Sequence, residues 1–111
     1  MQTIDYTDFL RIELKIGTII RAENFEKARK PAYKIWVDLG ELGVKKSSAQ
    51  ITDHYTLESL IGKQVMCVCN FPPKQIADFI SEVLVTGFSD SEGKIVLASV
   101  DQAVPNGARL H

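Results

Sequence analysis

The stretch Lys63–Phe88, KQVMCVCNFPPKQIADFISEVLVTGF, decides how this chain is organised. Two of its runs, Val65–Cys69 and Glu82–Thr86, are apolar and rich in β-branched residues, a composition that predicts strands. Pro72 and Pro73 come soon after the first run, and proline has no N–H to donate to a sheet. The first strand must therefore leave the sheet there, and a surface excursion must connect it to the second strand.

This excursion mixes apolar side chains with hydrogen-bonding side chains, as recognition loops do. Between the prolines and the second strand it contains Lys74, Gln75, Ile76, Phe79, Ile80 and Ser81. The alternative is a loop that packs its own Ile and Phe side chains, and periodicity alone does not separate the two interpretations.

The rest of the chain reads as short strands separated by turn signals. Strands are expected over Ile16–Phe25, Lys34–Leu39, Val44–Ile51, Val65–Cys69, Val83–Phe88 and Lys94–Ala98. Thr56 can cap a short helix that contains Leu57, Leu60 and Ile61 and ends at Gly62. Three strands, a helix and further strands are the order of an OB-fold, so we predict an all-β, five-stranded Greek-key barrel with its helix between strands three and four. A short N-terminal helix within Thr7–Leu14 and a C-terminal extension after Asp101 complete it.

Length and composition set limits on the class of protein. The 111 residues form one expected domain, 1–111, with 45% hydrophobic and 24% charged residues, as in ordinary globular proteins. No apolar run approaches the ~20 residues of a membrane span, and the N-terminus has no signal-peptide pattern, so we expect a cytoplasmic protein with no membrane insertion. Cys67 and Cys69 lie on one strand face and are expected to be buried thiols.

Catalytic, nucleotide-binding and metal-binding patterns are absent from the sequence. There is no phosphate-binding glycine motif and no Ser/His/Asp or Cys/His arrangement, so we expect no enzyme and no cofactor. His54 and His111 are the only histidines beside the two cysteines, too few at ligand spacing to predict a metal site. His54 is interpreted as a surface residue.

Charge is unevenly distributed although the net charge is only −1. Six basic residues and two acidic residues lie between Lys27 and Lys46, whereas five acidic residues and one basic residue lie between Ile76 and Asp101. The first segment permits a basic patch that meets phosphates, and an ordinary solvated face explains the same pattern.

Several segments also carry a family resemblance: KIWVDLG (34–40), SSAQI (47–51), LIGKQV (60–65), NFPP (70–73), SEVLV (81–85) and VPNG (104–107). In this order, across nearly the whole chain, they resemble the CsaA family of export-related chaperones, which are related to the tRNA-binding domain of methionyl-tRNA synthetases. The resemblance implies an OB-fold homodimer. The chain departs from the family pattern at Lys15, where an arginine is common, and at Asp78 and Ile80, where a glycine and a basic residue are usual.

Two binding hypotheses follow. The first is a passive CsaA-type chaperone for unfolded or pre-export polypeptides, with the Sec export machinery as a further partner. Apolar contacts and hydrogen bonds to the client backbone would come from Gln50, Asn70, Phe71, Pro72, Ile76, Phe79, Ile80 and Ser81. The second is a structure-specific tRNA binder that uses an aromatic residue such as Phe71 for base stacking. Its phosphate contacts would come from Lys15, Arg29, Lys30, Lys45, Lys46 and Lys74.

The N-terminal segment is more apolar than a free arm should be. A small barrel cannot bury a helix inside itself, so a partner's surface is expected to cover this segment in a two-fold homodimer. The expected interface residues are Phe9, Leu10, Ile12 and Leu14.

Overall fold

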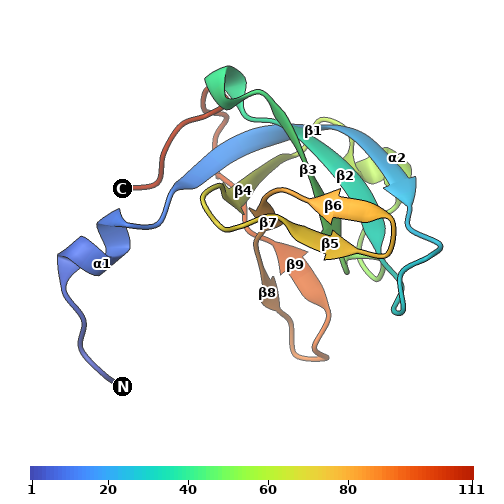
Figure 1. The fold of residues 1–111 in the computed structure, drawn as a ribbon, viewed down its shortest axis with the longest axis horizontal. Helices are drawn as coiled ribbons and strands as arrows, with labels where there is room; N and C mark the ends of the chain where they lie inside the picture. The colour runs from blue at the N-terminus through green and yellow to red at the C-terminus, as the bar shows by residue number, and fades with distance from the viewer.

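The computed structural model describes all 111 residues, and a five-stranded antiparallel sheet curled into a nearly closed barrel forms its centre (Figure 1). The strand order is β3-β2-β1-β4-β7. The strands are β1 (Leu14–Asn24), β2 (Tyr33–Asp38), β3 (Val44–Ala49), β4 (Gln64–Val68) and β7 (Leu84–Val85), and a 3-10 turn η1 (Gly40–Leu42) joins β2 to β3. The predicted OB-fold is confirmed.

The alternation in β2 places one set of side chains inside the barrel. Ile35, Val37 and Leu39 are completely buried, as their spacing predicts. Gly17 on β1 lies against this row, where a Cβ atom would overlap Cγ1 of Val37. Glycine is therefore required there because β1 and β2 approach closely, and the irregularity in their pairing falls between Ile19 and Arg21.

The helix α2 (Leu57–Leu60) lies between β3 and β4, where the sequence places it. The N–H of Ser59 donates to Oγ1 of Thr56 at 3.1 Å, and the N–H of Thr56 donates to Oγ of Ser59 at 2.9 Å. This reciprocal pair satisfies amide groups that the first turn leaves free. Gly62 follows with φ +90°, and Leu60 is buried in the barrel core.

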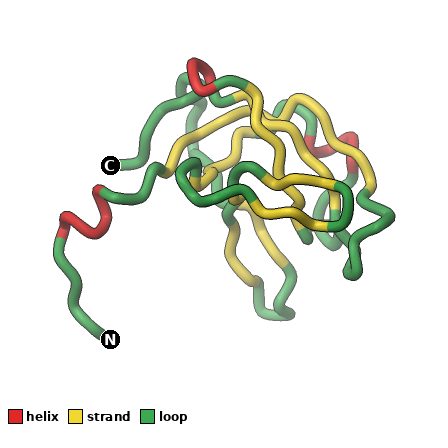
Figure 2. The backbone as a smooth tube through the Cα atoms, viewed as in Figure 1, coloured by secondary structure: helices red, strands yellow, loops and turns green.

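The segment after β4 differs from the prediction in two ways. Residues expected as an irregular excursion form a hairpin of β5 (Lys74–Ile76) and β6 (Phe79–Ser81). The single strand expected over Val83–Phe88 is wrong, because β7 ends at Val85 and β8 (Gly87–Ser89) pairs with β9 (Ile95–Leu97) in a separate hairpin. The break is at Thr86, whose N–H and hydroxyl both donate to the carbonyl of Met66. Figure 2 shows the β8–β9 hairpin extending away from the barrel.

The two ends of the chain flank β1. Helix α1 (Tyr6–Leu10) has no buried residue and stands away from the barrel (Figure 1). The C-terminal tail runs beside β1, where the carbonyl of Ala108 accepts from the N–H of Ile16 at 2.9 Å and the carbonyl of Leu14 accepts from the N–H of Leu110 at 2.8 Å. No helix has both the length and the apolar character needed to cross a bilayer.

Candidate functional site

The β5–β6 hairpin is fixed to the outside of the barrel by Phe79. This side chain is only 5% exposed, and its ring centre lies 5.4 Å from that of Phe25 and 6.0 Å from that of Trp36. The ammonium groups of Lys34 and Lys46 lie 5.3 and 5.2 Å from the Phe79 ring centre, a cation–π arrangement. The expectation that Phe79 is exposed is therefore wrong: strand alternation turns Phe79 inward and its neighbour Ile80 outward.

Two other predicted contact residues are used to hold chain segments together. Oγ of Ser81 accepts from the N–H of Ser48 at 3.2 Å, which ties β6 to the edge of β3. Oδ1 of Asn70 accepts from the N–H of Glu13 at 3.0 Å, and Nδ2 of Asn70 donates to the carbonyl of Arg11 at 2.8 Å. Both side chains have partners within the chain, so the structure gives them a positioning role.

A groove of about 880 Å³ lies between the loop that follows β1 and the β5–β6 hairpin. It brings together residues from both predicted sets, Arg29, Lys30 and Lys74 from the basic set and Gln50 and Ile76 from the polypeptide set. Its other lining residues are Lys27, Ala28, Ala32, Ser48, Gln75 and Ala77. Phe71, Pro72 and Ile80 are exposed but lie outside this lining.

One wall of the groove is the end of an unpaired strand edge. No strand pairs with β3 on the side opposite β2. The N–H and carbonyl of Lys46 face this edge and bond to Glu82, so Ser48 faces it too, because main-chain groups alternate along a strand. Gln50 follows directly after the last residue of β3, Ala49, and lines the groove. Ser81 takes the N–H of Ser48, and the main chain of Gln50 has no hydrogen bond within the protein. The groove therefore offers a free main-chain donor and acceptor.

The rim of the groove is positively charged. Lys27 forms an ion pair with Asp78 at 2.8 Å, whereas Arg29, Lys30 and Lys74 have no acidic partner within 4.0 Å. The hydrogen bond from Lys27 holds the pKa of Asp78 below its usual value. No carboxylate and no aromatic ring is among the lining residues.

The remaining predicted lysines do not join this rim. Lys45 pairs across the sheet with the fully buried Val37, whereas Lys46 pairs with Trp36 on the outer face. The two neighbouring lysines thus point to opposite faces, and their grouping in one patch is wrong because a strand alternates. Lys15 lies on β1 near Cys69, away from the groove.

Comparison with known proteins places this barrel in a family. Residues 14–109 match the family described as a putative tRNA binding domain. The chain belongs to this family. The methionine–tRNA ligases of Methanocaldococcus jannaschii and Methanococcus aeolicus are 31% and 36% identical to it over 110 residues, 99% of this chain. The chain spans only 17% and 16% of the lengths of those two proteins.

Solved structures similar to this tRNA-binding-domain chain include proteins of its own length. The chaperone CsaA of Bacillus anthracis is 47% identical with a TM-score of 0.93, and the match covers 99% of this chain and 100% of that chain. The CsaA chaperone of Picrophilus torridus is 44% identical with a TM-score of 0.92, covering 98% and 100% of the two chains. The resemblance to CsaA is confirmed over nearly the whole chain.

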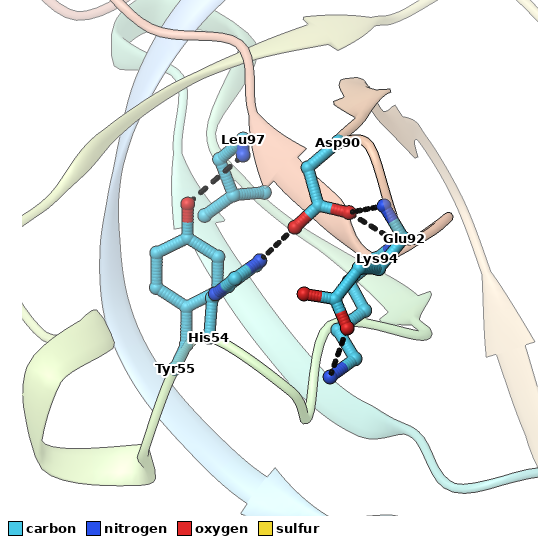
Figure 3. A network of polar contacts seen from close by, with 6 residues as sticks. All are labelled: His54, Tyr55, Asp90, Glu92, Lys94 and Leu97. Carbon is cyan, nitrogen blue, oxygen red and sulfur yellow. Dashed lines mark hydrogen bonds and ion pairs between the residues drawn. The ribbon is translucent and has the colours of Figure 1, made fainter.

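A second polar network in this tRNA-binding-domain chain lies where the β8–β9 hairpin meets the segment before α2 (Figure 3). Nε2 of His54 lies 2.7 Å from Oδ2 of Asp90, and the hydroxyl of Tyr55 accepts from the N–H of Leu97 at 2.9 Å. Oδ1 of Asp90 also accepts from the N–H groups of Glu92 and Lys94. His54 is a surface residue, as predicted, and it holds the hairpin turn.

The two thiols differ in environment. Cys67 is completely buried, and burial raises its pKa to about 12. Cys69 is half-buried, with a pKa raised chiefly by burial and opposed by the nearby charge of Lys15. Both are free and both are poorly ionised, so neither is suited to nucleophilic chemistry.

Sequence reasoning missed Lys27 and Ser48 as lining residues of the groove, and it missed Asp78 as the ion-pair partner of Lys27. Ser48 was visible as part of the SSAQI segment, but its position opposite Ser81 depends on a contact between residues 33 positions apart. The Lys27–Asp78 pair joins residues 51 positions apart, so no local signal reveals it.

Proposed function

We propose that this chain is a passive chaperone of the CsaA type that binds extended, non-native polypeptide in the groove between the loop that follows β1 and the β5–β6 hairpin. The observation that carries the proposal is the free main chain of Gln50, directly after the end of the edge strand β3, in a groove large enough for several residues of a peptide. An extended polypeptide brings unpaired N–H and carbonyl groups, and free main-chain groups can hydrogen-bond to them whatever the side chains of the polypeptide are. Sequence-independent binding is what a chaperone requires.

The groove also supplies limited apolar contact beside the free edge. Ile76, Ala28, Ala32 and Ala77 contribute apolar area within it, and the exposed Phe71 and Ile80 extend that area beyond it. Because no nucleotide-binding motif is present, binding would be stoichiometric, without driven cycles. The similar solved chains are described as chaperones, and the clients we propose are unfolded or pre-export polypeptides delivered to the Sec export machinery in the cytoplasm.

Substitution of Gln50 tests the main-chain contact directly. Gln50→Pro removes the free N–H, and Gln50→Ala keeps the N–H while it removes the side chain. Loss of one main-chain hydrogen bond should weaken binding of Gln50→Pro relative to Gln50→Ala by about 5-fold to 10-fold. The probe is fluorescein-labelled, reduced and carboxymethylated α-lactalbumin, a permanently unfolded polypeptide, and the readout is fluorescence anisotropy.

Thermal unfolding of both variants is the control for folding. Gln50 is exposed and its main chain has no internal hydrogen bond, so the two melting temperatures should agree with that of the wild type. Equal affinity of the two variants at equal stability would contradict the proposed use of the β3 edge.

A second function, tRNA binding, is favoured by the three unpaired cations Arg29, Lys30 and Lys74 at the rim. The family description and the methionine–tRNA ligase relatives support this candidate. With three phosphate contacts, the log–log salt slope for single-stranded RNA should be about −2. Titration with tRNA at several salt concentrations separates the candidates: tight binding that survives Gln50→Pro and falls with salt favours RNA.

We also propose that the functional form is a homodimer assembled through the chain termini. Leu10, Ile12 and Leu110 are exposed apolar residues at the two ends, and Phe88, 72% exposed, lines the same hollow as Leu110. An apolar hollow of about 520 Å³ is lined by Leu14, Met66, Phe88, Ala98 and Leu110 among others. Apolar surface of this extent is usual at subunit interfaces.

A further inference from the structure

The cations at the groove rim are not equivalent. Arg29, Lys30 and Lys74 have no acidic partner, whereas the ammonium of Lys27 is held by Oδ2 of Asp78 at 2.8 Å. This pair turns a rim with four positive side chains into one with three. Asp78 therefore sets the net charge that a ligand meets in the groove.

Asp78 stands at the tip of the β5–β6 hairpin, in the two-residue turn Ala77–Asp78. Ala77 has φ +53°, and its carbonyl accepts from Nε2 of Gln75 at 3.2 Å, so the turn is constrained from within the hairpin. The carboxylate reaches across to Lys27 on the loop after β1, which forms the opposite wall. The ion pair spans the mouth of the groove and joins its two walls.

The pair is exposed to solvent on both sides. The side chains of Lys27 and Asp78 are 69% and 54% exposed, and exposed ion pairs are weak because water and salt screen them. A carboxylate carried by a ligand can therefore exchange with Asp78 on Lys27 at little cost. Such an exchange would leave Lys27 neutralised and release Asp78 to water.

We propose that Asp78 is an internal competitor that occupies Lys27 and so selects, among extended polypeptides, segments rich in acidic residues. The inference rests on the proposed polypeptide-binding function of the same groove. A segment with a single carboxylate can pair with one of the three free cations. A segment with several carboxylates can also displace Asp78 and pair with the fourth cation, Lys27. Charge density of the client then determines affinity, while the β3 edge holds the main chain whatever its sequence.

The lining residues favour a polypeptide over RNA as the anionic ligand. Single-stranded nucleic acids bind through aromatic rings on which bases stack, and this groove has no aromatic ring in its lining. The free main-chain donor and acceptor at Gln50 match the adjacent N–H and carbonyl groups that an extended peptide backbone presents.

The test compares four proteins: wild type, Asp78→Asn, Lys27→Gln and the double variant. The probes are a fluorescein-labelled 12-residue peptide of alternating Asp and Ser and its twin with Asn for Asp, measured by anisotropy. Asp78→Asn should bind the acidic peptide about 3-fold to 5-fold more tightly, the size of one exposed ion pair. Lys27→Gln should lower affinity by the same factor in the Asp78→Asn background but by less than about twofold in the wild type.

Asp101→Asn is the matched control, since it removes one exposed carboxylate outside the groove lining and should change affinity by less than about twofold. An equal effect of Lys27→Gln in both backgrounds would mean independent charges and would overturn the proposal. The proposal would also be overturned if Asp101→Asn raised the affinity for the acidic peptide as much as Asp78→Asn does. The same holds if Asp78→Asn bound a 12-residue oligouridylate more tightly but not the acidic peptide. If the protein binds the unfolded polypeptide but Asp78→Asn does not bind the acidic peptide more tightly, only this inference is wrong. If no polypeptide binds at all, the proposed function is wrong as well.

Discussion

Phe71 and Phe79 belong to one loop region yet occupy opposite environments. Phe79 is 5% exposed and packs on Phe25 and Trp36, whereas Phe71 is 51% exposed. Phe79→Ala removes the ring that anchors the β5–β6 hairpin, and we expect it to cost about 3 kcal/mol of the free energy of unfolding. The melting temperature should fall by roughly 10 °C or more, as measured by circular dichroism.

Phe71→Ala is the matched substitution on the exposed side. Its effect on the free energy of unfolding should stay within about 0.5 kcal/mol. If Phe71 anchors clients, its loss should weaken binding of the unfolded α-lactalbumin probe by about 30-fold, the size of a typical aromatic anchor. Full affinity of a stable Phe71→Ala protein would remove this residue from the site.

At the scale of elements, patterns among neighbouring residues correctly predicted the strands and helices that such patterns determine. The alternation of Ile35, Val37 and Leu39 and the Thr56 cap depend on neighbouring residues, and β2 and α2 appear where those signals place them. The β5–β6 hairpin was missed because its turn is Ala77–Asp78, without the glycine or asparagine that marks such turns. The site depends on this hairpin, so only part of it was predictable: the groove residues Gln50, Ile76, Arg29, Lys30 and Lys74, but neither the ion pair nor the anchoring role of Phe79.

The β8–β9 hairpin should lose stability in acid because its turn is organised by an ionised Asp90. The hydrogen bond to His54, with those from the N–H groups of Lys94 and Glu92, lowers the pKa of Asp90 from 3.8. A carboxyl with a lower pKa in the folded state stabilises the protein fully above pH 3.8 and loses that contribution as the pH falls through the folded-state value.

Asp90→Asn should therefore be destabilised relative to wild type near pH 5.5, and the difference should shrink as the pH approaches about 3. Urea unfolding at a series of pH values measures this difference. Asp101→Asn, an exposed carboxylate with no ion-pair partner within 4.0 Å, should follow the wild type throughout. A gap between Asp90→Asn and wild type that is constant with pH would contradict the role of the ionised carboxylate.

At the scale of the molecule, the surface is divided between two regions. The basic groove lies on the side of the β5–β6 hairpin, whereas α1 and the C-terminal tail lie at the two chain ends (Figure 1), and residues of β8 and that tail line the apolar hollow. Charge complementarity suits the first region to a ligand, and apolar area suits the second to a subunit contact. A dimer through the ends would leave both grooves open, so each complex would offer a client two sites and gain affinity by avidity.

This arrangement predicts the behaviour of variants at the chain ends. Helix α1 buries none of its residues within its own chain, and Phe88 is the most exposed aromatic residue beside the apolar hollow. A second copy that covers this surface by two-fold symmetry forms a closed pair, the commonest arrangement of identical subunits.

Light scattering after gel filtration at micromolar concentration should give twice the mass of one chain. Deletion of residues 1–11, or Phe88→Ser, should give the mass of one chain, whereas Ile61→Ser, an equally apolar exposed site after α2, should leave the dimer intact. A wild-type monomer, or a dimer that survives the deletion, would show that the chain ends do not form the interface.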